Sequence, residues 1–262
     1  MSSIKHSLSL NFSTTNLPAG TSTHDFQLSF PSLELDRNHE YEIALTSYNI
    51  WYSWYNVSSA LGNNQFDYND GTGNVTYTIA NGQYSVSQLN SAMRALVTAN
   101  GKTPDFNFVA NYSTLKVDLT IGAGHTIAWT ASSCIYTLFG FTAPLTYTGA
   151  TTATSQTQPN ISNGVDAINI TTDLIDTRSN ILNDKWSNVI YQVTPQVGPG
   201  SLISANISSP IYLPLNTLGN IHSARFTITD QNGNILDLNG ETVSLSFHIK
   251  EHVSMVEIYK GP

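Results

Sequence analysis

The segment Ile221–Lys250, IHSARFTITDQNGNILDLNGETVSLSFHIK, carries the clearest structural signal in the chain. Apolar and polar residues alternate in its first third and again over its last eight residues, which is typical of strands with one buried face. Between these runs, Asn232-Gly233 and Asn239-Gly240 favour turns, because Asn and Gly tolerate a positive φ. The last strand is expected to direct four side chains into the core: Val243, Leu245, Phe247 and Ile249.

Short alternating runs of the same kind recur along the chain, for example at 26–35 and 75–79. Together they amount to about a dozen strands, at the spacing of a β-sandwich or barrel. One helix is expected at about 85–100, where Ser85 is a good N-cap and Gln88 completes a capping box. The sequence therefore predicts an all-β protein with one short helix that covers an end or edge of a sheet.

No repeat and no shift in composition marks a domain boundary, so we expect a single domain over 1–262. The alternation at 8–12 indicates a short strand or an ordered arm, and the arm would occupy 1–24. A Thr/Ser-rich stretch at 142–163 lacks periodicity and is expected to be a long loop, which in a compact domain is usually functional or flexible.

Charge is scarce in this chain. Only 11% of the residues are charged, against roughly 25% in ordinary domains, and none lies between Asp118 and Asp166. A polar surface with so few charges fits a protein whose sides are covered by neighbouring copies, and it also fits a lectin-like domain. The net charge of −8 and the scattered Lys and Arg argue against direct contact with nucleic acid.

The sequence shows no signal for export or membrane insertion. Its start, MSSIKHSLSLNFSTTN, has no apolar core of a signal peptide, and no run approaches the ~18 apolar residues of a membrane helix. The only cysteine, Cys134, excludes an intramolecular disulfide. We therefore expect synthesis in the cytosol.

No group of residues has the spacing of a catalytic, cofactor or metal site, so we expect none of these and no enzyme activity. His248 and His252 are four apart on a strand, about 13 Å, which is too far for one metal ion. Cys134 lies in an apolar run without a flanking base and is expected to be a structural thiol. An enzyme on a β-scaffold is thus the weakest hypothesis.

Positions 230–241 come closest to a metal-binding motif. Asp230, Asn232, Asn234 and Glu241 match places 1, 3, 5 and 12 of an EF-hand loop, but Ile235 stands where the loop needs Gly. The flanking segments are also strands rather than helices. A β-turn explains these oxygen-bearing side chains as well, and we favour that interpretation over a calcium site.

Two further features allow a functional and a structural interpretation. The aromatic run Trp51, Tyr52, Trp54 and Tyr55 fits a sugar-stacking platform or ordinary packing, and we favour packing. Glycosylation or chance explains the seven Asn-x-Ser/Thr sequons, and chance is favoured in a chain so rich in these residues. The sequons begin at Asn11, Asn56, Asn74, Asn111, Asn160, Asn169 and Asn206.

Five segments, taken in order, resemble one protein family. They are LTSYNIWYSWYNVS (45–58), TYTIANGQYSVSQLN (76–90), TLFGF (137–141), VIYQVTPQVGPG (189–200) and the long passage from IYLPLN to SFHIK (211–250). Together they resemble the minor, penton-forming jelly-roll capsid proteins of Polinton-like viruses and adintoviruses, relatives of the virophages.

The resemblance implies a single jelly-roll β-sandwich with extra hairpins, made in a host cell and located in the virion. It implies a homopentamer at the fivefold vertices of an icosahedral capsid, beside the major capsid protein of the same virus, without catalysis or cofactor. A compact double jelly roll, which would make the chain a major capsid protein, is the first alternative. A glycan-binding β-sandwich is the second, and a host glycan or receptor remains open as a partner.

Overall fold

A computed structural model describes residues 7–18, 21–36, 39–129, 135–142, 146–162, 164–182, 184–216 and 220–252. The chain divides into two compact units, of which unit 1 comprises Met1–Ser53 and Val165–Pro262, and unit 2 comprises Trp54–Gly164. Unit 2 is thus inserted into unit 1. The sequence predicted one domain over 1–262 and gave no sign of this division, because both units consist of similar short strands and their compositions do not reveal the boundary.

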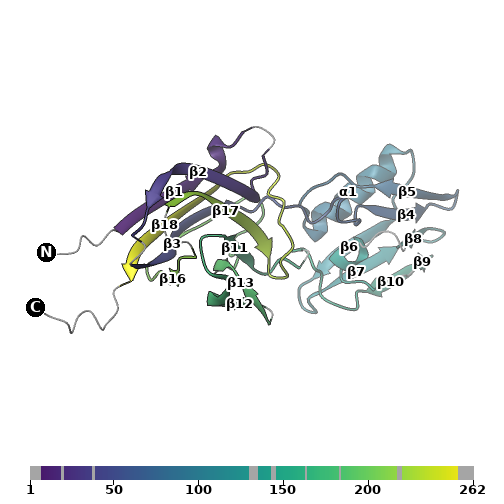
Figure 1. Ribbon diagram of the computed structural model, residues 1–262. Coiled ribbons are helices and arrows are strands. Elements are labelled where there is room, and N and C mark those ends of the chain that lie inside the picture. Colours follow the sequence, from purple (N-terminus) through teal and green to yellow (C-terminus); the bar gives the residue numbers. More distant parts are fainter. Residues whose placement is uncertain are drawn as a thin grey trace, which may run out of the picture. The chain divides into compact units, whose positions relative to one another are not determined.

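Unit 1 contains two antiparallel sheets (Figure 1). The first has the order β1 (Ser7–Ser13), β18 (Val243–His252), β3 (Glu40–Trp51) and β15 (Leu202–Asn206), and β16 (Leu213–Pro214) also pairs with β3. The second has the order β14 (Val189–Val193), β11 (Ile168–Thr172), β17 (Asn220–Asp230) and β2 (Asp25–Glu34).

The chain crosses between these two sheets in the manner of a jelly roll. Eight strands carry this plan, and in chain order they are β1, β2, β3, β11, β14, β15, β17 and β18. The first, third, sixth and eighth of them build the first sheet, and the second, fourth, fifth and seventh build the second. The hairpin of β12 (Asn180–Leu182) and β13 (Lys185–Ser187) and the short helices η1 (Thr14–Asn16) and η2 (Thr177–Ser179) are additions to this plan. The predicted jelly-roll sandwich with an extra hairpin is confirmed.

Alternation places the core of unit 1 between its sheets. Val243, Leu245, Phe247 and Ile249 of β18 are all at most 2% exposed, as predicted. The ring of Phe247 stacks on that of Phe226 from the other sheet, with centroids 5.3 Å apart, and Phe12 lies 5.0 Å from Phe226. Aromatic rings from β1, β17 and β18 therefore join the two sheets.

Unit 2 has its own core between two smaller sheets. One has the order β5 (Asn74–Thr78), β4 (Gln65–Asn69), β8 (Thr126–Ala128) and β9 (Thr146–Thr148), and the other β10 (Thr151–Thr154), β7 (Lys116–Ile121) and β6 (Phe106–Asn111). This is not the strand order of a jelly roll within the described residues, so the double-jelly-roll alternative is wrong. Unit 2 also contains α1 (Val86–Ala99) and α2 (Ile135–Leu138).

The helix α1 forms where it was predicted. The side chain of Ser85 accepts a hydrogen bond from the backbone N–H of Gln88, and the Gln88 side chain accepts one from the N–H of Ser85, which is a complete capping box. Leu89, Met93 and Val97 form its buried face, and all three are fully buried.

The possible N-terminal arm and the proposed long loop both contain strands, and at the N-terminus this agrees with the short strand expected at 8–12. The proposed arm 1–24 contains β1, which pairs with β18 along its whole length, so 7–13 is the edge strand of a sheet. The proposed loop 142–163 contains β9 and β10, which pair with β8 and β7. In these Thr-rich strands only Tyr147, Thr151 and Ala153 are even partly buried, so no apolar alternation revealed them.

Candidate functional site

The EF-hand-like segment forms a turn. Asp230 Oδ1 accepts hydrogen bonds from the backbone N–H groups of Asn232 and Asn234, each at 2.8 Å, and Asp230 Oδ2 accepts one from Asn234 Nδ2 at 2.9 Å. Both carboxylate oxygens thus hold the turn after β17 closed. Within the described residues, no three His, Cys, Asp or Glu side chains cluster as metal ligands would.

His248 on β18, considered above as a possible metal ligand, contacts two neighbouring segments of the chain. His248 Nε2 lies 2.5 Å from Ser7 Oγ on β1, and His248 Nδ1 lies 2.8 Å from the hydroxyl of Tyr212. The Lys250 ammonium lies 3.7 Å from the centre of the Tyr212 ring and 3.4 Å from a Glu42 oxygen. This polar cluster fastens the edge strand β1 to its sheet. Cys134 and the side chain of His252 lie outside the described residues.

The outer face of the second sheet carries a comparable ionic contact. Arg225 on β17 donates two hydrogen bonds to Asp25 on β2, at 2.9 and 2.7 Å, and these bonds lower the pKa of the Asp25 carboxyl. Asp173 accepts a further hydrogen bond from the Arg225 backbone N–H. The two carboxylates therefore hold β2 and the end of β11 against β17.

The aromatic run does not form a sugar-stacking platform. Trp54 is only 4% exposed and Tyr52 only 8%, while Tyr55 is 39% exposed. A platform needs aromatic faces that are open to the ligand, and two of the four rings are buried. Burial supports the packing interpretation for Tyr52 and Trp54, and it removes these two rings from the surface that the glycan-binding alternative needs.

Two of the seven sequons cannot accept a glycan in the folded protein, because Asn56 and Asn169 are fully buried. Asn169 Nδ2 donates to the Asp230 carbonyl at 2.8 Å, and Asn169 Oδ1 accepts from Gln192 at 2.9 Å. These amides have structural roles. The structure thus supports chance as the origin of at least these two matches.

Large apolar side chains are exposed at two hairpins. On the β12–β13 hairpin, Ile181 and Trp186 lie directly opposite each other and are 60% and 63% exposed. At the β6–β7 hairpin, Val109, Tyr112 and Leu115 are 50% to 87% exposed. Both hairpins are candidate surfaces for contact with other proteins, since large exposed apolar patches often mark such surfaces. Sequence reasoning missed Trp186, since no periodic pattern surrounds it.

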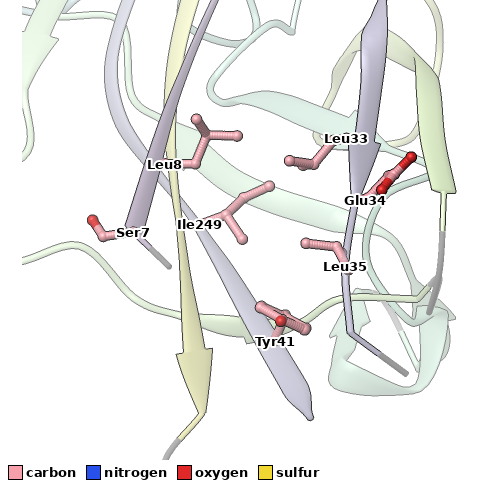
Figure 2. Close-up of a pocket in the computed structure, with 7 residues that line it drawn as sticks. All are labelled: Ser7, Leu8, Leu33, Glu34, Leu35, Tyr41 and Ile249. Carbon is pink, nitrogen blue, oxygen red and sulfur yellow. The ribbon is translucent and has the colours of Figure 1, made fainter. Parts of the chain in front are cut away.

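A small apolar cavity of about 110 Å³ lies in unit 1 (Figure 2). Leu8, Leu33, Leu35 and Ile249 point into it, together with Tyr41, and come from strands β1, β2, β3 and β18 or the segment after β2. Ser7 and Glu34 are its only polar lining residues. It offers no constellation for catalysis.

Across the described residues, no helix is long and apolar enough to span a membrane.

No family model matches the chain, and no curated protein matches it. The crystal structure of the mavirus penton protein aligns with 94% of this chain and 100% of its own, with a TM-score of 0.52 and 11% identity. A chain in the 3.5 Å cryo-EM structure of the Sputnik virophage aligns with 94% of this chain and 98% of its own, with a TM-score of 0.46 and 12% identity. The chain thus shares the fold of the mavirus penton protein over nearly its whole length.

Proposed function

We propose that this chain is a structural capsid protein of the penton type, which forms homopentamers at the fivefold vertices of an icosahedral capsid. The observation that carries the proposal is the shared fold: the mavirus penton protein matches over its full length, so both the jelly roll and the inserted unit 2 take part in the likeness. The protein would be located in the virion, beside the major capsid protein of the same virus.

The surface chemistry supports this proposal. Cyclic fivefold contacts are heterologous, so each copy must offer two different faces to its neighbours. Burying a charge without a partner costs free energy, and the low charge content of 11% reduces that cost. Asp25, Arg225 and Asp230 hold turns and strands together, which fits a structural role for these side chains.

The proposal is tested by the assembly of the purified protein. Negative-stain electron microscopy should show fivefold rings, and mass photometry should give about 140 kDa for five chains of 28.5 kDa each. Ring formation should be tried over a range of salt and protein concentrations and with the co-expressed major capsid protein. A species that stays monomeric under all these conditions would overturn the proposal.

A further inference from the structure

The three-stranded sheet of unit 2 ends in two outer strands. Its order is β10-β7-β6, so β7 lies in the middle, and within the described residues neither β10 nor β6 pairs with a further strand on its other side (Figure 1). Outer strands of this kind present N–H and C=O groups that readily pair with another chain.

Hydrogen-bond directions identify the groups at the β10 edge. Ser155 N donates to the Val117 carbonyl at 2.8 Å, and Val117 N donates to Ser155 Oγ at 3.0 Å, so Val117 directs its backbone groups toward the β10 side. Direction alternates along a strand, so Leu119 does the same and bonds with Ala153 opposite it. Thr152 and Thr154 therefore point their backbone groups to the open edge.

The same alternation directs Phe106, Phe108 and Ala110 to the open edge of β6. Helix α1 satisfies the first part of this edge, because Arg94 donates to the Phe106 carbonyl and Asn90 Oδ1 accepts from the Phe108 N–H at 3.0 Å. The Phe108 carbonyl and the Ala110 N–H have no such partner within the described residues. About two residues of the β6 edge are thus open.

A groove of about 540 Å³ runs beside this open part. Ser87 and Ser91 of α1 line one side with short side chains, while Ala110 and Tyr112 line the other. None of its lining residues is charged. The groove therefore has room for an extended backbone, and it favours a segment without charges, because an unpaired charge buried there would be costly.

Strand β10 of a second copy matches these requirements. It lies in the stretch 119–165, which contains no Asp, Glu, Lys or Arg. Its threonines have high strand propensity, and both Thr152 and Thr154 are exposed. Within one copy, β6 and β10 both run antiparallel to β7 and thus parallel to each other. If the sheet continues head to tail into a second copy, β6 of the first copy therefore pairs in parallel with β10 of the second.

We propose that β10 of one copy adds to β6 of the next, so that the unit 2 sheets join around the ring. The contact is heterologous, and in a closed ring it leaves no open edge. This inference rests on the proposed ring. The pairing spans only a few residues, so it buries far less surface than the ~800 Å² per partner of a stable interface. It therefore adds to other contacts in the ring and makes no stable dimer alone.

Disulfide trapping tests the pairing. Two double variants, Val109→Cys/Thr152→Cys and Val109→Cys/Thr154→Cys, are made in a Cys134→Ser background. These positions face outward on β6 and β10. Within one chain, Val109 and Thr154 lie two strands apart, about 9–10 Å, and Thr152 lies further away, whereas a disulfide needs less than about 7 Å between Cα atoms. Crosslinks can thus form only between copies.

Oxidation of the assembled protein should give a ladder up to covalent pentamers in at least one double variant. The single-Cys variants are the controls, since one cysteine per chain gives at most dimers. Rings without a ladder in either variant would overturn this inference alone. The absence of rings in the wild-type protein would overturn the proposed function, and the inference with it.

A charge placed in the groove gives a second measurement. Ser91→Lys should abolish the ladder when added to the crosslinking variant, because the lysine would be buried against an uncharged strand. Ala95→Lys lies one turn further along α1, is exposed and does not line the groove, so it should leave the ladder unchanged. Equal crosslinking in both variants would contradict the proposed strand addition.

Discussion

The side chain of Asn56 holds the two ends of unit 2 together. Its Nδ2 donates to the carbonyls of Tyr84 and Ile161 at 2.7 and 2.9 Å, and its Oδ1 accepts from the Tyr84 N–H at 2.9 Å. Asn56→Ala would leave these backbone groups without partners in a fully buried place. We expect a loss of roughly 1–3 kcal/mol in the free energy of unfolding, measured by chemical denaturation.

The exposed residue Asn74 provides the matched control, because it is also the first residue of a sequon. Asn74→Ala should change the free energy of unfolding by no more than about 0.5 kcal/mol. If the two variants were equally stable, Asn56 would not be the clamp that its hydrogen bonds indicate.

Asp70 makes the stability of unit 2 depend on pH. It accepts hydrogen bonds from the Thr72 hydroxyl at 2.6 Å and from the Lys102 ammonium at 3.0 Å, and these contacts lower its pKa to about 2. The folded-state pKa lies below the ordinary value of ~3.9. The stabilisation is therefore complete above about pH 5 and is lost as the pH falls from there toward 2.

The variant Asp70→Asn should remove that dependence. Its melting temperature should lie below that of the wild-type protein at pH 7 and should fall less steeply between pH 5 and pH 2. Melting curves over this pH range measure the effect, with Asp166→Asn at an exposed position of unit 1 as the control. Parallel curves for Asp70→Asn and the wild-type protein would rule out this role.

At the scale of the element, β18 is the central strand on which the jelly roll depends. It pairs with β1 on one side and with β3 on the other, and Val243 is fully buried. Val243→Asp places an unpaired carboxylate in the core, so we expect no soluble folded protein. The neighbouring Ser244→Asp, on the other face of β18, should remain soluble. Comparison of the soluble fractions checks this, and a soluble Val243→Asp would show that the strand is not central.

Two serine-to-alanine substitutions in and next to α1 should change the free energy of unfolding in different directions. Ser85→Ala removes the cap and should cost about 1 kcal/mol. Ser91→Ala lies at an exposed interior position and should be neutral or slightly stabilising, because Ala has the higher helix propensity. Urea unfolding of the two variants distinguishes these outcomes. Destabilisation by both substitutions would mean that the loss is not specific to the cap.

The sequence predicted an element correctly where residues close together in the chain determine its structure. The alternation of β18 and the caps of α1 are such cases, since each depends on residues close together in the chain. The strands β9 and β10 escaped prediction because their partners β8 and β7 supply most of the buried surface. The exposed pair Ile181 and Trp186 gave no periodic signal, so only the structure shows that the two side chains lie opposite each other and are exposed.

For the whole molecule, the decisive feature is an insertion that no local pattern reveals. Unit 2 enters between β3 and β11, and its residues alternate in the same way as those of unit 1. The alternation therefore identifies strands in both units, but it does not show which strands share a core. The number of strands exceeds the eight of a jelly roll because unit 1 contains the additional short strands β12, β13 and β16 and because unit 2 contributes strands of its own.

Each unit should fold without the other, because each has its own core. The hydrogen bond between Asn56 and Ile161 brings the entry and exit of unit 2 together, three and four residues from its borders with Ser53 and Val165. A Gly-Ser linker of about eight residues can therefore replace Trp54–Gly164 without stretching the chain. The shortened protein should be soluble and unfold in one cooperative thermal transition, followed by circular dichroism, and isolated 54–164 should do the same. Aggregation of the shortened protein, with the full chain soluble, would show that the jelly roll needs unit 2 in order to fold.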